Sequence, residues 1–327
     1  MAVYVNTNYS ALQGQRYLGN VQNSLTTTYQ RLSSGLRINS AKDDAAGLQI
    51  ADRLTSQING LNQGNRNAAD GIALAQTVEA GMDEISGMLQ KIRTLTVQAA
   101  NGTNTKEDRA ALSKEATALA TEINRIATQT TFAGKKVLNG KGDDSILGPD
   151  AAGGNGQNGT AGKAGATGAM TLQVGSNKGD VISFNLQSVM FSQLTGKVDD
   201  LITKGAGKVF STDENTGLVT VTFTKADFGN PAAKDYIGAV IALMDTAIAN
   251  VDGMRADLGA IQNRLESSIR NQSNVAANEA DARSRIRDAD FAEESANLSQ
   301  QSIIQQAAAS MLMQANTRPQ LGLSLLG

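Results

Sequence analysis

The sequence predicts a mainly α protein: a long, coiled-coil-like helical bundle formed by pairing of the N- and C-terminal segments, with a small β-hairpin-rich central region. Three observations support this fold class. Apolar residues recur at spacings of three and four near both ends of the chain, as in a heptad seam. The middle of the chain changes to glycine-rich and alternating segments. Aromatic residues make up only 4% of the chain, which favours helical rods over a compact globule.

Two helices are expected in the N-terminal part of the chain. The first covers about residues 6–32, with seam positions Ala11, Gly14, Leu18, Val21, Leu25, Thr28 and Leu32. The second covers residues 44–98, with seam positions Ala51, Leu54, Ile58, Leu61, Val78, Met82, Ile85, Leu89 and Ile92. At 1.5 Å per residue the second helix would extend about 80 Å. That length suits a coiled bundle better than a globular domain.

The polar segment NGTNTKEDR separates the second helix from a third. Thr105 and Asp108 fit a capping box, and an acidic first turn suits the helix dipole. The third helix then carries the apolar residues Leu112, Leu119, Ile123 and Ile126.

The clearest seam of the chain lies in its C-terminal part. Apolar residues alternate at spacings of three and four at Ile237, Val240, Met244, Ala247, Val251, Met254, Leu258, Ile261 and Leu265. An ordinary amphipathic helix would explain part of this pattern, but nine matched positions favour a coiled-coil-like seam. The N- and C-terminal helices must pair with each other, because otherwise both would leave their seams exposed.

The central region reads as turns and hairpins. The segments MTLQV and VISFNL alternate around the turn GSNKGD, and KVFS and LVTVTFT flank TDENTG, so two β-hairpins are expected. Residues 148–168 are rich in glycine and almost free of large apolar side chains, which predicts a flexible surface loop.

The composition excludes several classes of function. The chain has no Cys and no His, so it lacks the ligands of common zinc sites and the residues of Ser-His-Asp or Cys-His catalysis. We expect no catalytic residues, metal or cofactor, and interpret the carboxylate pairs at residues 143–144 and 199–200 as solvated turns. A net charge of −2 argues against nucleic acid as a partner. No apolar run is long enough to cross a membrane, and the N-terminus lacks the pattern of a signal peptide.

The C-terminal tail predicts a surface that another chain covers. Between residues 295 and 327 the only charged side chain is Arg318. An apolar stripe contains Ile303, Ile304, Ala307, Ala308, Met311, Leu312 and Ala315, and the opposite face carries Ser302, Gln305, Gln306, Ser310 and Gln314. A solvated helix usually carries Lys or Glu on its outer face, whereas uncharged polar groups are buried at lower cost. A lone helix docked on its own domain would explain the stripe but not the missing charge.

The segment SGLRINSAKDD predicts a connection between helices. Gly35 permits a left-handed helix end, and Ser40 with Asp43 fits a capping box for the next helix. The charged residues within this segment and just before it are Arg31, Arg37, Lys42, Asp43 and Asp44. They are candidates for ion pairs with another chain or for a solvated helix–loop–helix connection.

Two stretches at opposite ends of the chain resemble bacterial flagellins. They are LSSGLRINSAKDDAAGLQIADRL, residues 32–54, and ARSRIRDADFAEESANLSQQSIIQQAAASMLMQAN near the C-terminus. The resemblance covers about residues 1–140 and 231–327. It implies a subunit that polymerises into the flagellar filament for motility, and it favours contacts between subunits for the charged connector residues.

The resemblance also implies how the chain is divided. Residues 1–43 with 287–327 would form an inner domain at the filament core, and residues 44–140 with 231–286 a helical rod domain. Residues 141–230 would form the hairpins and variable loop. The filament-core contacts are then expected at Leu18, Val21, Leu25, Leu32, Ile303, Ile304, Ala308, Met311, Leu312 and Ala315.

Further partners and the location follow from the same resemblance. Flagellins leave the cell through the type III export apparatus with a chaperone on the C-terminal helix, and their filament contacts cap and hook-junction proteins. The segment QKIRTLTVQ resembles the family's Toll-like receptor site and places candidate receptor contacts at Lys91, Leu95 and Glu115. The expected location is extracellular, in the flagellum. Alternatives are a hook–filament junction protein, which shares the helical termini, and a free-standing coiled-coil adhesin.

Overall fold

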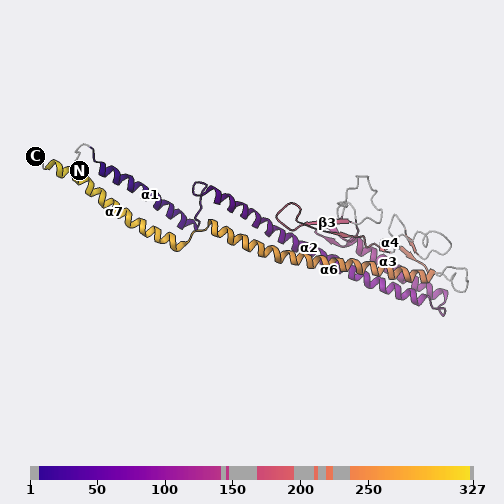
Figure 1. The fold of residues 1–327 in the computed structure, drawn as a ribbon. Helices are drawn as coiled ribbons and strands as arrows, with labels where there is room; N and C mark the ends of the chain where they lie inside the picture. Colours follow the sequence, from indigo (N-terminus) through magenta and orange to yellow (C-terminus); the bar gives the residue numbers. More distant parts are fainter. Residues whose placement is uncertain are drawn as a thin grey trace. The chain divides into compact units, whose positions relative to one another are not determined.

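The structure, a computed structural model, describes residues 7–140, 145–146, 168–194, 210–212, 219–223 and 236–324 (Figure 1). The chain forms two compact units. Unit 1 contains residues 1–59 and 274–327, and unit 2 contains residues 60–273. Unit 1 therefore combines the two ends of the chain. Unit 2 contains the middle of the chain together with the helices on both sides of it.

Unit 1 is built around two antiparallel helices, α1 (Tyr9–Ser34) and α7 (Phe291–Ser324), which run side by side in Figure 1. The contacts between them show the antiparallel direction: Asn8, before the start of α1, bonds to Ala315 near the end of α7, and Arg31, near the end of α1, bonds to Glu294 at the start of α7. The first part of α2 (Ala45–Ala99) and the last part of α6 (Tyr236–Arg287) complete the unit. The pairing of terminal segments predicted from the sequence is confirmed.

The ends of α1 follow from its flanking residues. The side chain of Asn8 accepts a hydrogen bond from the backbone N–H of Ala11 at 3.1 Å and so caps the first turn. Gly35 ends the helix in the left-handed conformation, with φ 71° and its N–H donating to the Arg31 carbonyl, as expected from the sequence.

The start of α2 differs from the prediction. Ser40 and Asp43 do not cap α2; they close a turn that precedes it, and the helix begins only at Ala45. The cap is Asp44, whose carboxylate accepts a hydrogen bond from the Gly47 N–H three residues further on, at 2.9 Å. The N-cap is therefore Asp44 and not Ser40, which the sequence pattern favoured as the N-cap of a capping box with Asp43.

Unit 2 contains most of the core. Helix α3 (Lys106–Gln129) follows α2. Helix α6 runs antiparallel to α2, because residues later in α2 bond to residues earlier in α6. The pairs are Asn65 with Ser273, Glu79 with Gln262 and Arg93 with Asp245. The predicted seams meet in one cluster that includes Val78, Met82, Ile85, Leu89, Ile92, Met244, Val251, Leu258 and Leu265. The capping box of Thr105 and Asp108 at the start of α3 is confirmed.

Within the described residues, the strands form three antiparallel pairs. The predicted hairpins are present as β3 (Gly168–Gln173) with β4 (Val181–Leu186), and β5 (Phe210–Thr212) with β6 (Val219–Val221). A short pair, β1 (Thr131–Phe132) and β2 (Lys135–Lys136), was not predicted. Its two-residue turn has positive φ at both Ala133 and Gly134, which is typical of a tight hairpin. Helix α4 (Phe191–Leu194) follows β4 and packs against α3.

Some predictions fall on residues that the structure leaves undescribed. The glycine-rich segment 148–167 and the carboxylate pairs at residues 143–144 and 199–200 lie outside the described residues. The division into three domains remains a prediction, and the boundaries of the two units fall at residues 59/60 and 273/274.

Candidate assembly surface

The two units differ sharply in where they place large apolar side chains. Among the described residues, unit 1 contains ten of the twelve exposed ones: Tyr9, Leu12, Tyr17, Tyr29, Ile50, Val275, Phe291, Ile303, Met311 and Met313. It contributes only five of the 39 buried apolar residues, namely Val21, Ile38, Ala51, Ile58 and Ala308. Unit 1 therefore leaves uncovered the kind of surface that usually marks an interaction site.

The predicted seam of α1 packs within the chain. Val21 is buried, and Leu18, Leu25 and Leu32 are half-buried. On α7 the corresponding positions are Ala308, which is buried, and Ile304, Leu312 and Ala315, which are half-buried. A β-carbon on Gly14 would stand 3.3 Å from the Leu312 side chain, so the glycine lets the helices approach closely at this point.

Three residues of the predicted stripe, Ile303, Ala307 and Met311, are exposed and lie outside this seam. Ile303 is 67% exposed and Met311 is 68% exposed. The polar residues Gln306, Ser310 and Gln314 are exposed as well, and the described α7 side chains from 295 to 317 carry no charge. The outer surface of α7 is thus a mixture of apolar and uncharged polar groups.

Polar contacts fix the register of α1 against α7. The Asn8 amide donates to the Ala315 carbonyl at 2.8 Å, and the Thr28 hydroxyl donates to the Gln301 side chain at 3.4 Å. Arg31 forms an ion pair with Glu294 at 3.1 Å. These contacts hold one helix alignment, since a shift by one turn would break all three.

The connecting segments of unit 1 pair through their backbones. The N–H groups of Arg37 and Ile38 both donate to the Arg287 carbonyl, at 2.7 and 3.4 Å, and the Ala289 N–H donates to the Gly35 carbonyl at 3.0 Å. The Arg37 guanidinium also donates to the Ile286 carbonyl at 2.6 Å. The segments before α2 and after α6 therefore form a small antiparallel bridge.

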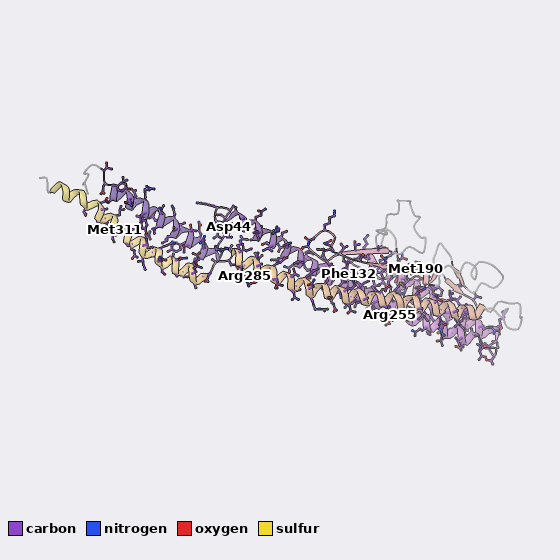
Figure 2. The ribbon with its side chains drawn as sticks, viewed as in Figure 1. Asp44, Phe132, Met190, Arg255, Arg285 and Met311 are labelled. Carbon is purple, nitrogen blue, oxygen red and sulfur yellow. The ribbon has the colours of Figure 1, made fainter. Side chains whose placement is uncertain are left out.

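The other predicted connector residues lie next to this bridge. Lys42, Asp43 and Asp44 are exposed, and Asp44 is labelled at the start of α2 in Figure 2. The Ser40 N–H, the Asn39 N–H and the Ser40 hydroxyl donate to the Asp43 carboxylate at 2.9, 3.1 and 3.1 Å. These hydrogen bonds lower the pKa of Asp43 below its ordinary value.

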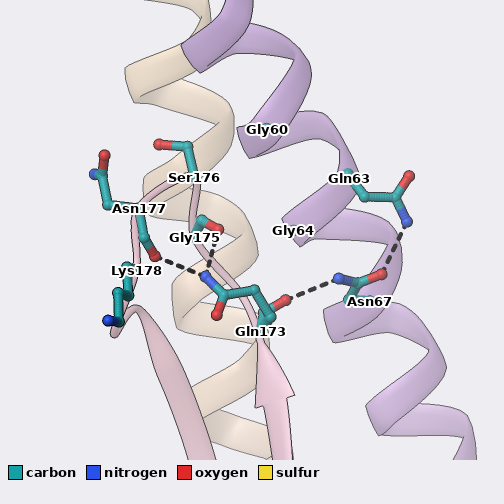
Figure 3. A pocket seen from close by; sticks show the side chains of 9 residues that line it. All are labelled: Gly60, Gln63, Gly64, Asn67, Gln173, Gly175, Ser176, Asn177 and Lys178. Atoms are coloured by element: carbon teal, nitrogen blue, oxygen red, sulfur yellow. Dashed lines mark hydrogen bonds between the residues drawn. The ribbon is translucent and has the colours of Figure 1, made fainter.

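In unit 2 the β3–β4 turn docks on a row of glycines in α2. The Val174 carbonyl occupies the place where a β-carbon on Gly64 would stand, and a β-carbon on Gly60 would lie 2.7 Å from Ser176. Asn67 bridges the two elements by donating to the Gln173 carbonyl at 2.9 Å (Figure 3). The polar pocket in Figure 3 is thus the seam between this turn and α2.

The candidate receptor contacts also lie in unit 2. Lys91 of α2 and Glu115 of α3 form an ion pair at 3.0 Å, with both side chains about half-exposed. Leu95 is only 7% exposed and belongs to the core. The structure therefore brings Lys91 and Glu115 together on the surface and places Leu95 beneath it.

Several surface residues escaped the sequence analysis. Tyr9, Tyr17 and Tyr29 of α1 and Met313 of α7 are exposed but lie outside the heptad positions. The available signal was the presence of large apolar side chains on the expected polar face of a helix. The glycines at positions 60, 64 and 71 also escaped notice, although repeated glycine in a helix interior often marks a close approach of another backbone.

The described part of the chain offers neither a metal centre nor a membrane-spanning segment. No group of three or more His, Cys, Asp or Glu residues there could hold a metal ion. Likewise, none of the described helices is both long enough and apolar enough to span a bilayer.

These features define a helical structural protein whose terminal segments pair and expose an apolar surface. Family models match both ends of the chain: the bacterial flagellin N-terminal helical region over residues 5–143 and the bacterial flagellin C-terminal helical region over residues 241–326. The chain belongs to the bacterial flagellin family. It is accordingly a subunit of the extracellular flagellar filament that serves motility, and its family is one of structural proteins.

Curated flagellins match this chain over its whole length. The chain is 38% identical to flagellin D of Vibrio anguillarum, 37% to polar flagellin F of Vibrio parahaemolyticus and 38% to flagellin C of Vibrio cholerae, each with complete coverage of both chains. A solved structure described as a flagellar hook-associated protein from V. parahaemolyticus matches with a TM-score of 0.53 at 18% identity, over 75% of this chain and all of the other. That likeness shows the fold alone, and the hook–filament junction alternative is not favoured.

Proposed function

We propose that the surface of unit 1 is the main contact between subunits in the filament. The observation that carries this proposal is the concentration of exposed apolar side chains in unit 1. A helix pair that exposes this much apolar surface gains stability when neighbouring copies cover it, at about 25 cal/mol for each Å² removed from water. Within this surface, Ile303 and Met311 contact neighbouring copies directly. The other predicted contact residues hold the α1–α7 pair in shape; they are Leu18, Val21, Leu25, Leu32, Ile304, Ala308, Leu312 and Ala315.

The connector contributes charge to the same assembly. Arg37, Lys42, Asp43 and Asp44 are exposed, and an exposed charge is free to pair across a subunit boundary. Arg31 is tied to Glu294 and supports the helix pair instead. On this proposal salt weakens filament assembly, because screening acts on exposed pairs.

The proposed partners outside the filament follow from family membership. The chain is exported by the type III apparatus with a chaperone on α7, and its filament contacts cap and hook-junction proteins. Lys91 and Glu115 offer a charged pair to a host Toll-like receptor, with Leu95 shaping the surface from below. Replacing Lys91 by Ala should reduce receptor signalling, whereas Arg93→Ala, which removes the pair with Asp245, should leave signalling intact.

Seeded assembly tests the main proposal. A chain that lacks residues 304–327 should fail to extend filament seeds, because it lacks the exposed Met311 and Met313 together with the α7 residues that pack against α1, while unit 2 keeps its helical content. A chain that lacks residues 148–167, and so keeps all of β3, is the matched control and should assemble normally. Electron microscopy scores assembly and circular dichroism scores folding. Filament growth by the truncated chain would refute the proposal.

A further inference from the structure

Met311 differs from the core methionines in its exposure to solvent. Of the eight methionines in the described residues, Met82 and Met244 are fully buried, and Met88, Met170, Met190 and Met254 pack against the core. Met311 and Met313 are 68% and 66% exposed (Met311 is labelled in Figure 2). The susceptibility of a thioether to oxidants follows its exposure, so these two sulfurs are the reactive ones in this set.

The two exposed methionines lie on different flanks of α7. Successive residues in a helix are turned by roughly 100°, so Met311 and Met313 stand on opposite sides of Leu312, which faces α1. Met311 shares its flank with the exposed residues Ile303 and Ala307. Among the described side chains, Met313 shares its flank with Gln306 and Ala309, and no other large apolar residue lies beside it there.

We propose that Met311 is an oxidation site that controls assembly: its sulfoxide blocks the addition of a free subunit to the filament. This inference rests on the proposed contact surface of unit 1. Hydrogen peroxide transfers one oxygen atom to the thioether sulfur: its O–O bond breaks, the sulfur gives up two electrons, and the second oxygen leaves as water. The product carries a polar S=O group in the middle of an apolar flank.

The effect depends on the state of the subunit. In a free subunit the Met311 sulfur is open to the oxidant. Once a neighbouring copy covers the flank, the sulfur is protected, so existing filaments persist while new subunits are rejected. A buried sulfoxide without a hydrogen-bond donor opposes the contact. We expect the critical concentration to rise at least tenfold, which corresponds to about 1.4 kcal/mol per subunit.

Peptide mapping can read out the site directly. Trypsin cleaves after Arg287 but not between Arg318 and Pro319, so the C-terminal peptide, residues 288–327, contains Met311 and Met313 and no other methionine. The peptide of residues 67–91 contains Met82 and Met88 and serves as the core control. Fragmentation of the first peptide separates the two sulfoxides. Met311 should gain oxygen in the free subunit and much less in preformed filaments.

Leucine variants assign the effect. After peroxide treatment, Met311→Leu should extend seeds like the untreated protein, and Met313→Leu should stay blocked. Three results would each overturn the inference. The first is rescue of assembly by Met313→Leu, the second is normal assembly of wild-type protein that carries the Met311 sulfoxide, and the third is equal oxidation of Met311 in free subunits and in filaments. If the untreated chain fails to extend seeds, both the proposed contact surface and the inference are wrong. If the untreated and the oxidised chains both extend seeds, only the inference is wrong.

Discussion

Arg31 of α1 and Glu294 of α7 form an ion pair across the terminal helices, with 3.1 Å between guanidinium and carboxylate. The Glu294 side chain is only 9% exposed and that of Arg31 is 32% exposed. The carboxylate is therefore largely removed from water and depends on this partner. Surface pairs elsewhere in the unit are different: Arg285 and Asp281 are 79% and 63% exposed.

The first prediction follows from this difference. Arg31→Ala leaves a nearly buried carboxylate without its partner and should lower the stability of the α1–α7 pair by about 1–3 kcal/mol. Arg285→Ala, the matched control, should change stability by less than about 0.5 kcal/mol. Hydrogen exchange of α1 and α7 peptides measures both variants. Equal loss of protection in the two would show that Glu294 does not need Arg31.

The second prediction concerns acid. The pKa of Asp43 is lowered chiefly by the Ser40 N–H, then by the Asn39 N–H and the Ser40 hydroxyl. A lowered pKa in the folded state means that the carboxylate stabilises the turn above the ordinary Asp value of about 3.9, and that this contribution is lost as pH falls through the lowered value. Protection of the Asn39 and Ser40 amides should therefore be constant at neutral pH and fall in strong acid.

The neutral variant supplies the control for this titration. Asp43→Asn should weaken protection of both amides at neutral pH and flatten their dependence on pH. An unchanged acid profile in this variant would assign the titration to another group.

The third prediction separates capping from assembly at Asp44. Asn caps helices about as well as Asp, so Asp44→Asn should leave α2 nearly unchanged, whereas Asp44→Ala should destabilise it by about 1 kcal/mol. Asp44→Lys removes the same cap and also reverses the charge. If Asp44 pairs with a neighbouring subunit, Asp44→Lys should raise the critical concentration above that of Asp44→Ala, and added salt should reduce the difference. Identical critical concentrations for the Ala and Lys variants would leave capping as the role of this carboxylate.

The fourth prediction concerns the glycine row beneath the β3–β4 turn. Gly64→Ala places a methyl group where the Val174 carbonyl lies, so the turn must move, at a cost of about 1–3 kcal/mol. Gly87→Ala is the matched control in the same helix, because nothing lies within 4 Å of its added carbon. That change should stabilise α2 by about 0.5–1 kcal/mol. The melting temperature should fall in Gly64→Ala and rise in Gly87→Ala. A rise in both variants would mean that the β3–β4 turn moves aside at no cost.

Periodicity was enough to predict the helices and their pairing, because burial of an apolar seam dominates a long helix. Val78, Met82, Ile85 and Leu89 are fully buried, as their spacing required. The two central hairpins were also predicted, since alternation and turn residues act locally.

The features that escaped prediction depend on tertiary contacts. The N-cap is Asp44 and not the predicted Ser40, because Ser40 and Asp43 close a separate turn before the helix begins. The docking of Val174 on Gly64 joins residues far apart in the sequence, and a single glycine gives no sign of which backbone will approach it. The exposure of Met311 could not be separated from the burial of Leu312, because both belong to one apolar stripe and the position of α1 decides between them.

The backbone bridge between residues 35–38 and 286–289 has a mechanical consequence. In an antiparallel pair the hydrogen bonds lie perpendicular to the strands, so a pull along either segment loads several bonds at once rather than opening them one after another. The connection that follows α1 and the one that follows α6 share such a load through main-chain atoms, so most side-chain substitutions leave the strength of the bridge unchanged. Proline at residue 37, 38 or 289 would instead remove a hydrogen bond that bears load.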